Sequence, residues 1–308
     1  MLPNFIIGGA AAAGTSFLSS ILMQHEDVYL PKQMRPEPHY FHYSYHYKNP
    51  IEWYSQKWFS DWDGQKAVGE RSSWYLAGPD CPARIFKHLP DVKLIFTIRD
   101  PVERAWANYR FTVLSGLDEL DFETALDLEH ERTQNEEGKW AEIQPRHYTG
   151  RSYYGKQIRN YLKYFSWEQI LLVSSEKLSK DTDGELKRIC DYLGVPHKFD
   201  YEIPPNFASL SVINPAVQKE CRDHFKDRFD FFVENTRLES TDVENLLLDD
   251  IDREMYSKLR DNLGNKKEDM DPAIRIRLRN LFESDSEDFF NVCRDNINFD
   301  QSVWKSWK

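Results

Sequence analysis

Short apolar runs alternate with amphipathic stretches over the first two thirds of the chain. Apolar runs of three to seven residues are too short for most buried helices and predict buried strands. The predicted strands are residues 4–9, 28–30, 67–70, 93–99 and 169–173. Apolar positions at helical spacing predict helices, at residues 15–24, 81–88, 121–131, 153–165 and 184–193 and from Pro101 onward. Short strands that alternate with helices indicate an α/β fold with a parallel sheet and helices on both faces.

The ends of three predicted helices carry the residue types expected there. Gly14 or Thr15 caps the helix at 15–24. Pro101 stands at a first helical position, where its fixed backbone angle is favourable. Gly194 ends the helix at 184–193.

Two stretches interrupt this alternation. Residues 36–62 are rich in His, Tyr and Trp and contain three prolines, which indicates loops and short helices. Residues 200–262 are acidic and irregular in pattern, so we expect a lid or an insertion there rather than a separate domain. We therefore expect a single domain over residues 1–308.

Polar segments follow three of the predicted strands directly. They are Gly9–Ser16, Glu70–Ser73 and Arg99–Asn108. Because ligands of parallel α/β sheets bind beyond the carboxyl ends of the strands, we expect these segments to converge on one crevice.

The segment Gly9–Ser16 has the composition of a phosphate-binding loop. It follows a strand, consists of small residues and leads into a helix, so that backbone N–H groups and hydroxyls can donate to an anion. Gly9 and Gly14 have the spacing of an NTPase loop, but Thr15 stands where that motif has lysine. This argues against a P-loop kinase or ATPase. For the loop taken alone, the alternative is close packing at the helix entry.

Two further charged residues are candidates for chemistry. Arg99 ends a strand before a helix N-terminus, where a guanidinium can bind phosphate bidentately. The alternative is a salt bridge from Arg99 or Arg104 to a nearby acid. Glu37 stands between two prolines that hold it in position, which suits a general base. The alternative for Glu37 is an exposed loop acid.

The composition of the chain argues against several classes of binding partner. With 51 acidic against 40 basic residues, the net charge of −11 makes nucleic acid an unexpected partner. No apolar run has membrane-spanning length, so no membrane partner is expected, and four widely spaced cysteines indicate reduced thiols in the cytoplasm. His39, His42 and His46 share helical spacing without acids or cysteines at fitting positions, so we expect no metal. The aromatic content and the acidity would suit a small, cationic acceptor.

The order and spacing of these segments resemble the sulfotransferase superfamily that uses 3′-phosphoadenosine 5′-phosphosulfate (PAPS), over most of the chain. Gly9–Leu18 is similar to the family's phosphosulfate loop, usually Lys-x-Gly-Thr-Thr, and Leu94–Tyr109 to its 3′-phosphate segment. Glu37–Phe41 resembles its Lys-Glu-Pro-His-Phe-Phe element. Gly69–Leu76 resembles its Gly-Glu-Lys-[Ser/Thr]-Pro-x-Tyr-Leu block. The second half of the pattern is found at Ser152–Phe165, Glu168–Val173, Ile189–Val195 and Met270–Phe282.

The resemblance implies a P-loop-like parallel sheet and transfer of a sulfuryl group from PAPS to a hydroxyl or amine, leaving 3′-phosphoadenosine 5′-phosphate (PAP). The expected acceptor is a small molecule, such as a natural product, and the expected assembly is a homodimer. Glu37 would be the general base, with His39 orienting or replacing it; a packed histidine is the alternative. The implied nucleotide-binding residues are Ala11, Ala13, Gly14, Thr15, Ser16, Arg99, Ala107, Asn108, Tyr154, Lys266 and Lys267. The implied acceptor-binding residues are Tyr40, Arg71 and Trp74.

The sequence departs from the family pattern at two positions. Ala12 aligns with the family lysine that bridges to the leaving oxygen, and Ala107 aligns with a serine at the 3′-phosphate, where Asn108 could donate instead. Losing the lysine removes several kcal/mol of transition-state stabilisation. Either another cation takes its place, from Lys32, Arg35 or Arg71, or the chain is an inactivated or silent nucleotide-binding relative. We expect an active enzyme.

Overall fold

The computed structural model describes residues 1–32, 36–203, 210–236, 241–265 and 268–294 together with residues 299, 302 and 304. The chain forms two compact units. The first comprises Met1–Arg104, Thr149–Pro204 and Arg275–Lys308, and the second comprises Ala105–Tyr148 and Pro205–Ile274.

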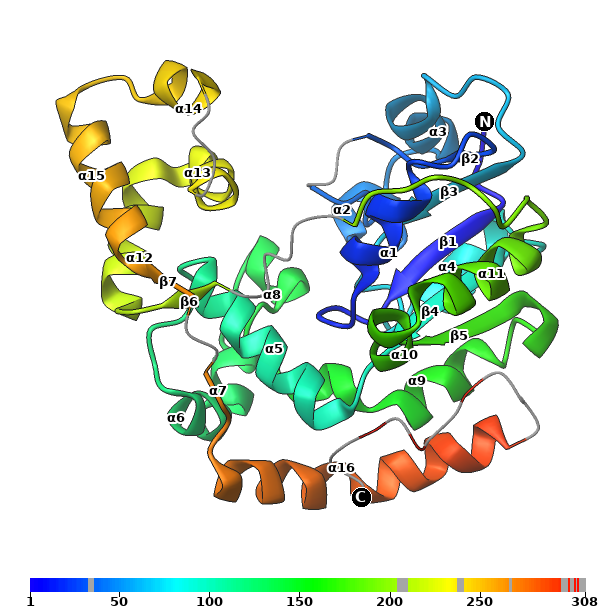
Figure 1. Cartoon of the computed structure of the whole chain (residues 1–308). Helices are drawn as coiled ribbons and strands as arrows, with labels where there is room; N and C mark the ends of the chain where they lie inside the picture. The colour runs from blue at the N-terminus through cyan, green and yellow to red at the C-terminus, as the bar shows by residue number, and fades with distance from the viewer. Residues whose placement is uncertain are drawn as a thin grey trace. The chain divides into compact units, whose positions relative to one another are not determined.

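The first unit is built on a five-stranded parallel sheet with strand order β2-β3-β1-β4-β5. The strands are β1 (Phe5–Gly9), β2 (Val28–Tyr29), β3 (Ala67–Arg71), β4 (Lys93–Ile98) and β5 (Ile170–Ser174). Figure 1 shows β1, β4 and β5 side by side. The predicted parallel α/β fold is confirmed, and each strand lies within one or two residues of its predicted position.

The two faces of the sheet are covered by different helices. Because successive strand residues point to opposite faces, Phe5 and Ile7 pack in a cluster with residues of α1, α10 and α11. Ile6 lies in the opposite cluster with residues of α3, α4, α9 and α16. Both clusters are fully buried at the sheet, which explains why these strands read as continuous apolar runs.

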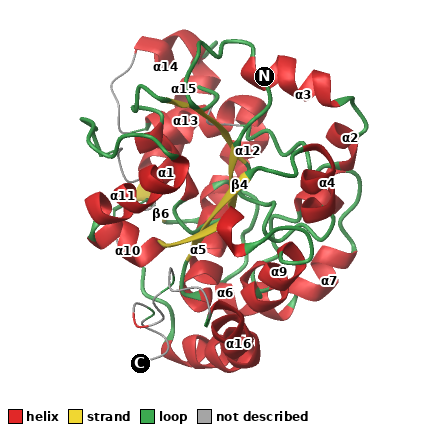
Figure 2. Cartoon of the chain, turned by 90° about the vertical axis from the view of Figure 1, so that its right-hand side faces the viewer, coloured by secondary structure: helices red, strands yellow, loops and turns green. Residues whose placement is uncertain are grey.

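Most of the chain outside the sheet is helical (Figure 2). The α-helices of the first unit are α1 (Thr15–Leu22), α2 (Ser44–Tyr47), α3 (Ile51–Phe59), α4 (Cys81–His88), α9 (Tyr154–Tyr161), α10 (Ser175–Lys180), α11 (Thr182–Leu193) and α16 (Pro272–Cys293, which begins in the second unit). As expected, Gly14 is the N-cap of α1 and Gly194 the C-cap of α11. Within the described residues, no helix is both long and apolar enough to cross a membrane.

The second unit holds the remaining elements. They are α6 (Phe122–Asp127), α7 (Glu129–Gln134), α8 (Lys139–Ile143), α12 (Pro215–Phe225), α13 (Phe229–Asn235), α14 (Thr241–Leu246), α15 (Asp250–Asp261) and a short antiparallel pair, β6 (Ser211–Val212) and β7 (Leu263–Gly264). Helix α5 (Pro101–Leu114) begins in the first unit and continues into the second. The helix predicted at 121–131 is two helices, α6 and α7, which meet at Leu128.

Residues 200–262, whose pattern predicted no helices, are mostly helical in the part that the structure describes. Helices α12, α13 and α15 bury a cluster that includes Phe225, Phe229, Phe232 and Leu259. Most charged residues of these helices, acidic and basic, are exposed and separate the apolar positions in the sequence, although Asp252 is buried. Whether this region acts as a lid stays a prediction.

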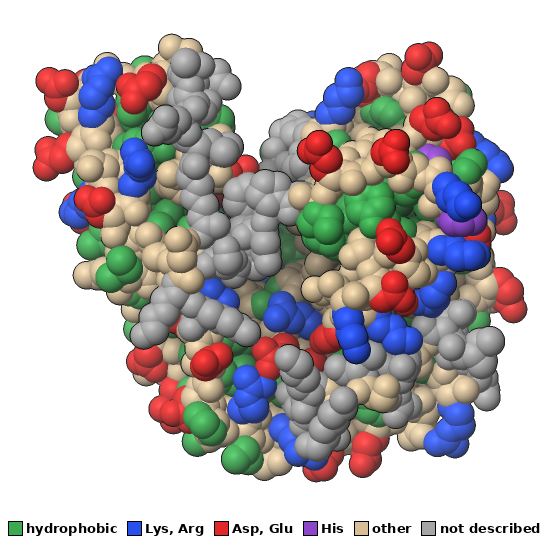
Figure 3. Space-filling view, viewed as in Figure 1, with side chains coloured by type: hydrophobic (Ala, Val, Ile, Leu, Met, Phe, Trp, Pro, Cys, Tyr) green, Lys and Arg blue, Asp and Glu red, His purple; other side chains and the backbone are tan. Residues whose placement is uncertain are grey.

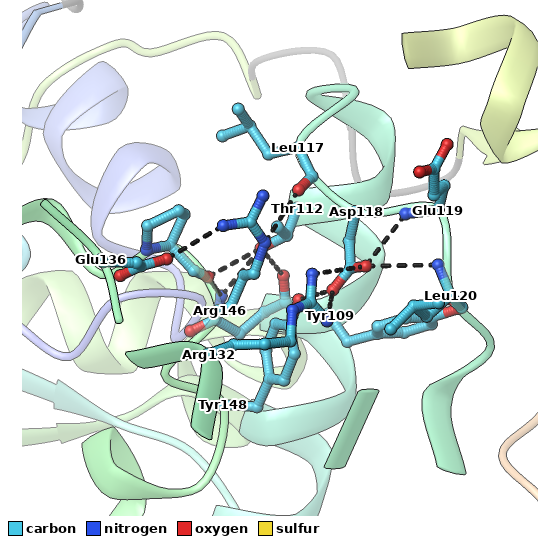
Figure 4. A network of polar contacts seen from close by, with 12 residues as sticks. Tyr109, Thr112, Leu117, Asp118, Glu119, Leu120, Arg132, Glu136, Arg146 and Tyr148 are labelled. Carbon is cyan, nitrogen blue, oxygen red and sulfur yellow. Dashed lines mark hydrogen bonds and ion pairs between the residues drawn. The ribbon is translucent and has the colours of Figure 1, made fainter. Parts of the chain in front are cut away.

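A polar network organises the second unit around Asp118 (Figure 4). The buried Asp118 carboxylate accepts two hydrogen bonds from Arg132, at 2.9 and 3.0 Å, and one from the Tyr148 hydroxyl at 2.5 Å. It also accepts from the backbone N–H groups of Glu119 and Leu120. Five donors on one carboxylate tie α7 and residue 148 to the turn after α5.

Candidate functional site

The loop between β1 and α1 presents backbone rather than side chains. Gly14, the N-cap of α1, has a φ of 92°, and no side chain caps the first amides of the helix. Ala12 also has a left-handed backbone, with a φ of 64°. The first amides of a helix lack partners within the helix, and they carry the positive end of its dipole. The loop is therefore suited to an anion, with the hydroxyls of Thr15 and Ser16 beside it.

Two arginines fix this loop through its carbonyl oxygens. Arg99 donates from Nη1 to the Ala12 carbonyl at 3.2 Å. Arg104, whose side chain is 0% exposed, donates to the Ala11 carbonyl at 3.3 Å and from Nε to Ser152 Oγ at 2.6 Å. Arg104 was not among the predicted site residues. The signal for it was its place on the first turn of the helix that follows Arg99.

Glu37 is held in a nearly closed environment. Its side chain is 13% exposed. Oε2 accepts from the Ser73 backbone N–H at 2.7 Å and from Ser73 Oγ at 2.8 Å, and it lies 3.1 Å from His39 Nε2. Oε1 pairs with Arg71 Nη1 at 2.8 Å. The alternative of an exposed loop acid is therefore wrong.

These contacts keep Glu37 ionised. Burial by itself raises the pKa of the Glu37 carboxyl, but Arg71, His39 and the Ser73 N–H outweigh burial and lower that pKa to about 2. Sequence reasoning missed Ser73, because nothing in the sequence indicates which N–H meets the carboxylate.

Arg71 joins the loop to Glu37. It is the last residue of β3, and its Nη1 donates to Ser16 Oγ at 2.5 Å as well as pairing with Glu37. The candidate base, the cation and the loop hydroxyl therefore form one continuous polar chain. This is the convergence predicted for the segments that follow β1 and β3.

His39 lies between Glu37 and an aromatic wall. Its ring is buried and stacks on Trp74 with centroids 4.8 Å apart. The Arg151 guanidinium lies over the Trp74 ring, 4.6 Å from its centroid. His39 is thus both packed, as the alternative reading proposed, and in contact with Glu37.

Two other expected residues lie deeper than a contact with a ligand requires. Tyr40 is 1% exposed, stacks on Tyr54 and donates to the Asn49 carbonyl at 2.7 Å. Any effect of Tyr40 on an acceptor would therefore be indirect. Tyr154 begins α9 and is also buried; burial raises the pKa of its hydroxyl, which the nearby Arg104 partly offsets.

The residues expected at a 3′-phosphate beyond Arg99 belong to the second unit. Ala107 is half-buried on α5. The Asn108 amide donates within its own unit, to Thr112 Oγ1 at 3.3 Å and to the Pro145 carbonyl at 3.4 Å, next to the network of Figure 4. Lys266 and Lys267, and also Arg35, lie outside the described residues.

The surface charge is mixed rather than uniformly acidic. Acidic and basic side chains are interspersed on the face shown in Figure 3. Among the described residues, no group of three His, Cys, Asp or Glu side chains is arranged to hold a metal ion.

Comparison with known proteins gives the same family as the motifs. The family described as "Sulfotransferase domain" matches residues 2–290. Heparan sulfate glucosamine 3-O-sulfotransferase 3A1 of Mus musculus is 34% identical over 194 residues, which are 63% of this chain and 46% of that protein. The 3B1 enzyme of Homo sapiens is 34% identical over 232 residues, which are 74% of this chain and 56% of that protein. The chain thus spans about half the length of these curated relatives.

A solved structure supports the fold. The sulfotransferase from Alicyclobacillus acidocaldarius superposes with a TM-score of 0.70 over 99% of both chains, at 23% sequence identity. Because the family match extends over most of the sequence, through the loop at Gly9–Ser16 and the segments that carry Glu37, Arg71 and Arg99, the chain belongs to the sulfotransferase domain family.

Proposed function

We propose that this protein transfers a sulfuryl group from PAPS to an acceptor hydroxyl or amine, with Glu37 as the general base. The observation that carries the proposal is the polar chain Ser16–Arg71–Glu37, which links an anion-binding loop directly to a buried, ionised carboxylate. Membership of the sulfotransferase family supports it.

The loop fits the phosphosulfate end of the donor. Donor binding would place anionic oxygens at the amides of Gly14–Ser16, where the N-cap residue is a glycine and makes no side-chain capping hydrogen bond. Arg99 and Arg104 hold the loop carbonyls and so keep these amides pointing outward. The PAPS donor supplies the sulfuryl group, and the loop stabilises the negative charge that develops on the leaving phosphate oxygen.

Glu37 would receive the acceptor's proton. In the transfer, the acceptor oxygen or nitrogen forms a bond to sulfur while the bond from sulfur to the bridging phosphate oxygen breaks. The acceptor's proton becomes strongly acidic as its bond to sulfur forms, so a carboxylate with a low pKa can accept it. His39 and Ser73 hold the carboxylate in place for this step.

Arg71 supplies the charge that Ala12 lacks. Of the three substitute cations considered, Lys32 is exposed and Arg35 lies outside the described residues, whereas Arg71 donates directly to the loop at Ser16. We infer that Arg71 takes over part of the charge stabilisation that the family lysine provides. This favours an active enzyme over a silent nucleotide-binding relative.

The surroundings of Glu37 disfavour the cationic acceptor that composition suggested. Arg71 pairs with Glu37, and Arg151 lies over Trp74, the ring on which His39 stacks, so one guanidinium contacts the carboxylate and a second lies on the same aromatic wall. A neutral or anionic acceptor is the better match. The relatives named for heparan sulfate glucosamine make a glucosamine-containing oligosaccharide the first acceptor to assay. A natural-product acceptor, a cytoplasmic location and a homodimer remain predictions.

The test combines donor binding with turnover. We expect calorimetry to show PAP binding to the purified protein, and labelled PAPS to give transfer to an oligosaccharide acceptor but not to a small amine. Glu37→Gln should lower kcat by about 100-fold or more while PAP binding stays unchanged. Absence of PAP binding would refute the proposed function, and full activity of Glu37→Gln would refute the assigned base.

A second variant separates an active enzyme from a silent relative. Ala12→Lys restores the family residue in the same loop. If Arg71 supplies the missing charge, kcat should rise less than about tenfold in Ala12→Lys. A wild-type protein without turnover that gains it through Ala12→Lys would instead identify the chain as an inactivated relative.

A further inference from the structure

Glu70 is a second buried carboxyl group close to Glu37, and the proposed reaction does not use it. It lies on β3 next to Arg71, and its side chain is 0% exposed. Its carboxylate accepts from Ser72 Oγ at 2.7 Å and from the Tyr54 hydroxyl at 3.1 Å. The Tyr75 hydroxyl also hydrogen-bonds to it.

Ser72 connects this carboxyl group to His39. The Ser72 hydroxyl donates to Glu70 and accepts the backbone N–H of His39 at 2.8 Å. The Ser72 backbone N–H is itself fixed by the Ile7 carbonyl at 3.1 Å, so the hydroxyl starts from a rigid point on the sheet.

His39 needs such support. Its φ of 44° lies in the left-handed region, which residues other than glycine rarely adopt. From this backbone conformation its Nε2 reaches Glu37. A hydrogen bond that fixes the His39 N–H therefore also fixes the direction of the ring.

We propose that Glu70 is a positioning residue for the reaction proposed above: through the Ser72 hydroxyl it holds the His39 backbone, and thereby the His39–Glu37 pair, in the working geometry. The proposal rests on the proposed function for its kinetic consequences, but the hydrogen-bond chain can be tested without turnover.

The charges around Glu70 give the proposal a pH dependence. The titratable groups that face it are Tyr54 from α3, Tyr75, Cys81 from α4, Tyr161 from α9 and the Glu37 carboxylate. Burial and, to a smaller extent, the charge of Glu37 raise the pKa of Glu70 to about 7, against the opposing effect of its hydroxyl donors. Burial also raises the pKa of the two tyrosines that donate to it, so they stay neutral.

Ionisation of Glu70 should therefore increase turnover. As pH rises through about 7, Glu70 loses its proton, and both carboxylate oxygens can accept hydrogen bonds, including the one from Ser72. The charge of Glu37 raises the pKa of Glu70, so the charge of Glu70 raises the proton affinity of Glu37 in return. We expect kcat to rise with pH across this range, by about tenfold.

The kinetic test compares pH profiles. In Glu70→Gln the rise near pH 7 should disappear, and Ser72→Ala should lower kcat by about tenfold above pH 7 and by less below it. Tyr54→Phe removes one donor to the carboxylate, so the midpoint should move to higher pH. Glu52→Gln, an exposed acid on the same helix as Tyr54, is the matched control and should keep the wild-type profile. PAP binding should be unchanged in all four variants.

A spectroscopic test decides the proposal even if the proposed function fails. With carboxyl-labelled glutamate, the NMR signal of Glu37 should show a step at the titration midpoint of Glu70, and this step should be absent in Glu70→Gln. The His39 ring signals should shift in Ser72→Ala but not in Glu52→Gln. An unchanged Glu37 titration in Glu70→Gln, or unchanged His39 signals in Ser72→Ala, would overturn the proposal; missing PAP binding alone would refute only the proposed function.

Discussion

The surroundings of Glu37 and those of Glu70 differ in one decisive respect. Both carboxyl groups are buried, and both accept several hydrogen bonds. Glu37 also contacts a guanidinium, Arg71, whereas the groups that hydrogen-bond to Glu70 are neutral hydroxyls. The pKa of Glu37 is lowered to about 2, while that of Glu70 is raised to about 7.

The comparison teaches that burial does not by itself set the charge of an acid. Removal of water disfavours the carboxylate at both sites, and hydroxyl donors recover only part of that cost. A cation in direct contact reverses the balance. The two groups therefore suit different tasks: Glu37 is ionised over the whole physiological range, and Glu70 changes charge within it.

Removing the cation should have the largest effect. Arg71→Ala leaves Glu37 buried without its guanidinium, which should destabilise the protein by about 3–5 kcal/mol and raise the pKa of Glu37. Denaturant unfolding measures the loss. Arg71→Lys keeps the positive charge, so it should retain more than half of the free energy of unfolding that Arg71→Ala loses.

A matched control lies in the second unit. Arg132→Ala removes the guanidinium from the buried Asp118 and should cost stability of similar size, again about 3–5 kcal/mol. It should leave the titration of Glu37 unchanged. If Arg71→Ala leaves the Glu37 titration at its wild-type position, the contrast with Glu70 has another cause.

The two acids should affect stability in opposite pH ranges. Glu37, with a lowered pKa, contributes stability that is present above its ordinary value of 4.5 and is lost as pH falls toward about 2. Glu70, with a raised pKa, contributes stability that is full below 4.5 and is lost as pH rises through about 7. Across each of these pH ranges, the free energy of unfolding should change by about 3 kcal/mol.

Unfolding of Glu37→Gln and Glu70→Gln at several pH values separates these contributions. Between about pH 5 and pH 8, the free energy of unfolding of Glu70→Gln should rise relative to that of the wild type. For Glu37→Gln the difference should change only below about pH 4.5. Parallel curves for the two variants would contradict the comparison.

The smallest expected effect concerns a single neutral donor. Tyr54→Phe removes one hydroxyl from Glu70 and should lower stability by about 1 kcal/mol at pH 8. At pH 5, where Glu70 is protonated, the loss should be smaller. An equal loss at both pH values would show that the Tyr54 hydroxyl does not respond to the charge of Glu70.

Much of the fold was predictable because the strands of a parallel sheet that is buried on both faces stand out in the sequence as short apolar runs. Runs such as Phe5–Ile7 and Leu94–Phe96 are apolar throughout, and the residues that follow these strands must meet at one edge of the sheet. The loop at Gly9–Ser16 and the place of Arg71 at the same edge of the sheet follow from this topology, whereas the contact of Arg71 with Glu37 was not predicted.

Other features depend on tertiary contacts that no local pattern encodes. Arg104 stands on the first turn of the helix after Arg99, but nothing in the sequence shows that its side chain is buried. Tyr40 resembles a ligand-contacting aromatic residue, although it belongs to the core. The helices between Pro215 and Asp261 were missed because charged residues of both signs stand between their apolar positions in the sequence. The difference between Glu37 and Glu70 depends on a guanidinium that reaches one and not the other.

One nitrogen of Arg71 serves two partners that are far from it in the sequence, Ser16 and Glu37. Substitutions at these three positions should therefore be non-additive, because each changes what the other two can do. Epistasis of this kind means that a scan of single substitutions would misjudge which sequences this site tolerates. A library that varies positions 16, 37 and 71 together would reveal working combinations whose individual members are each harmful alone.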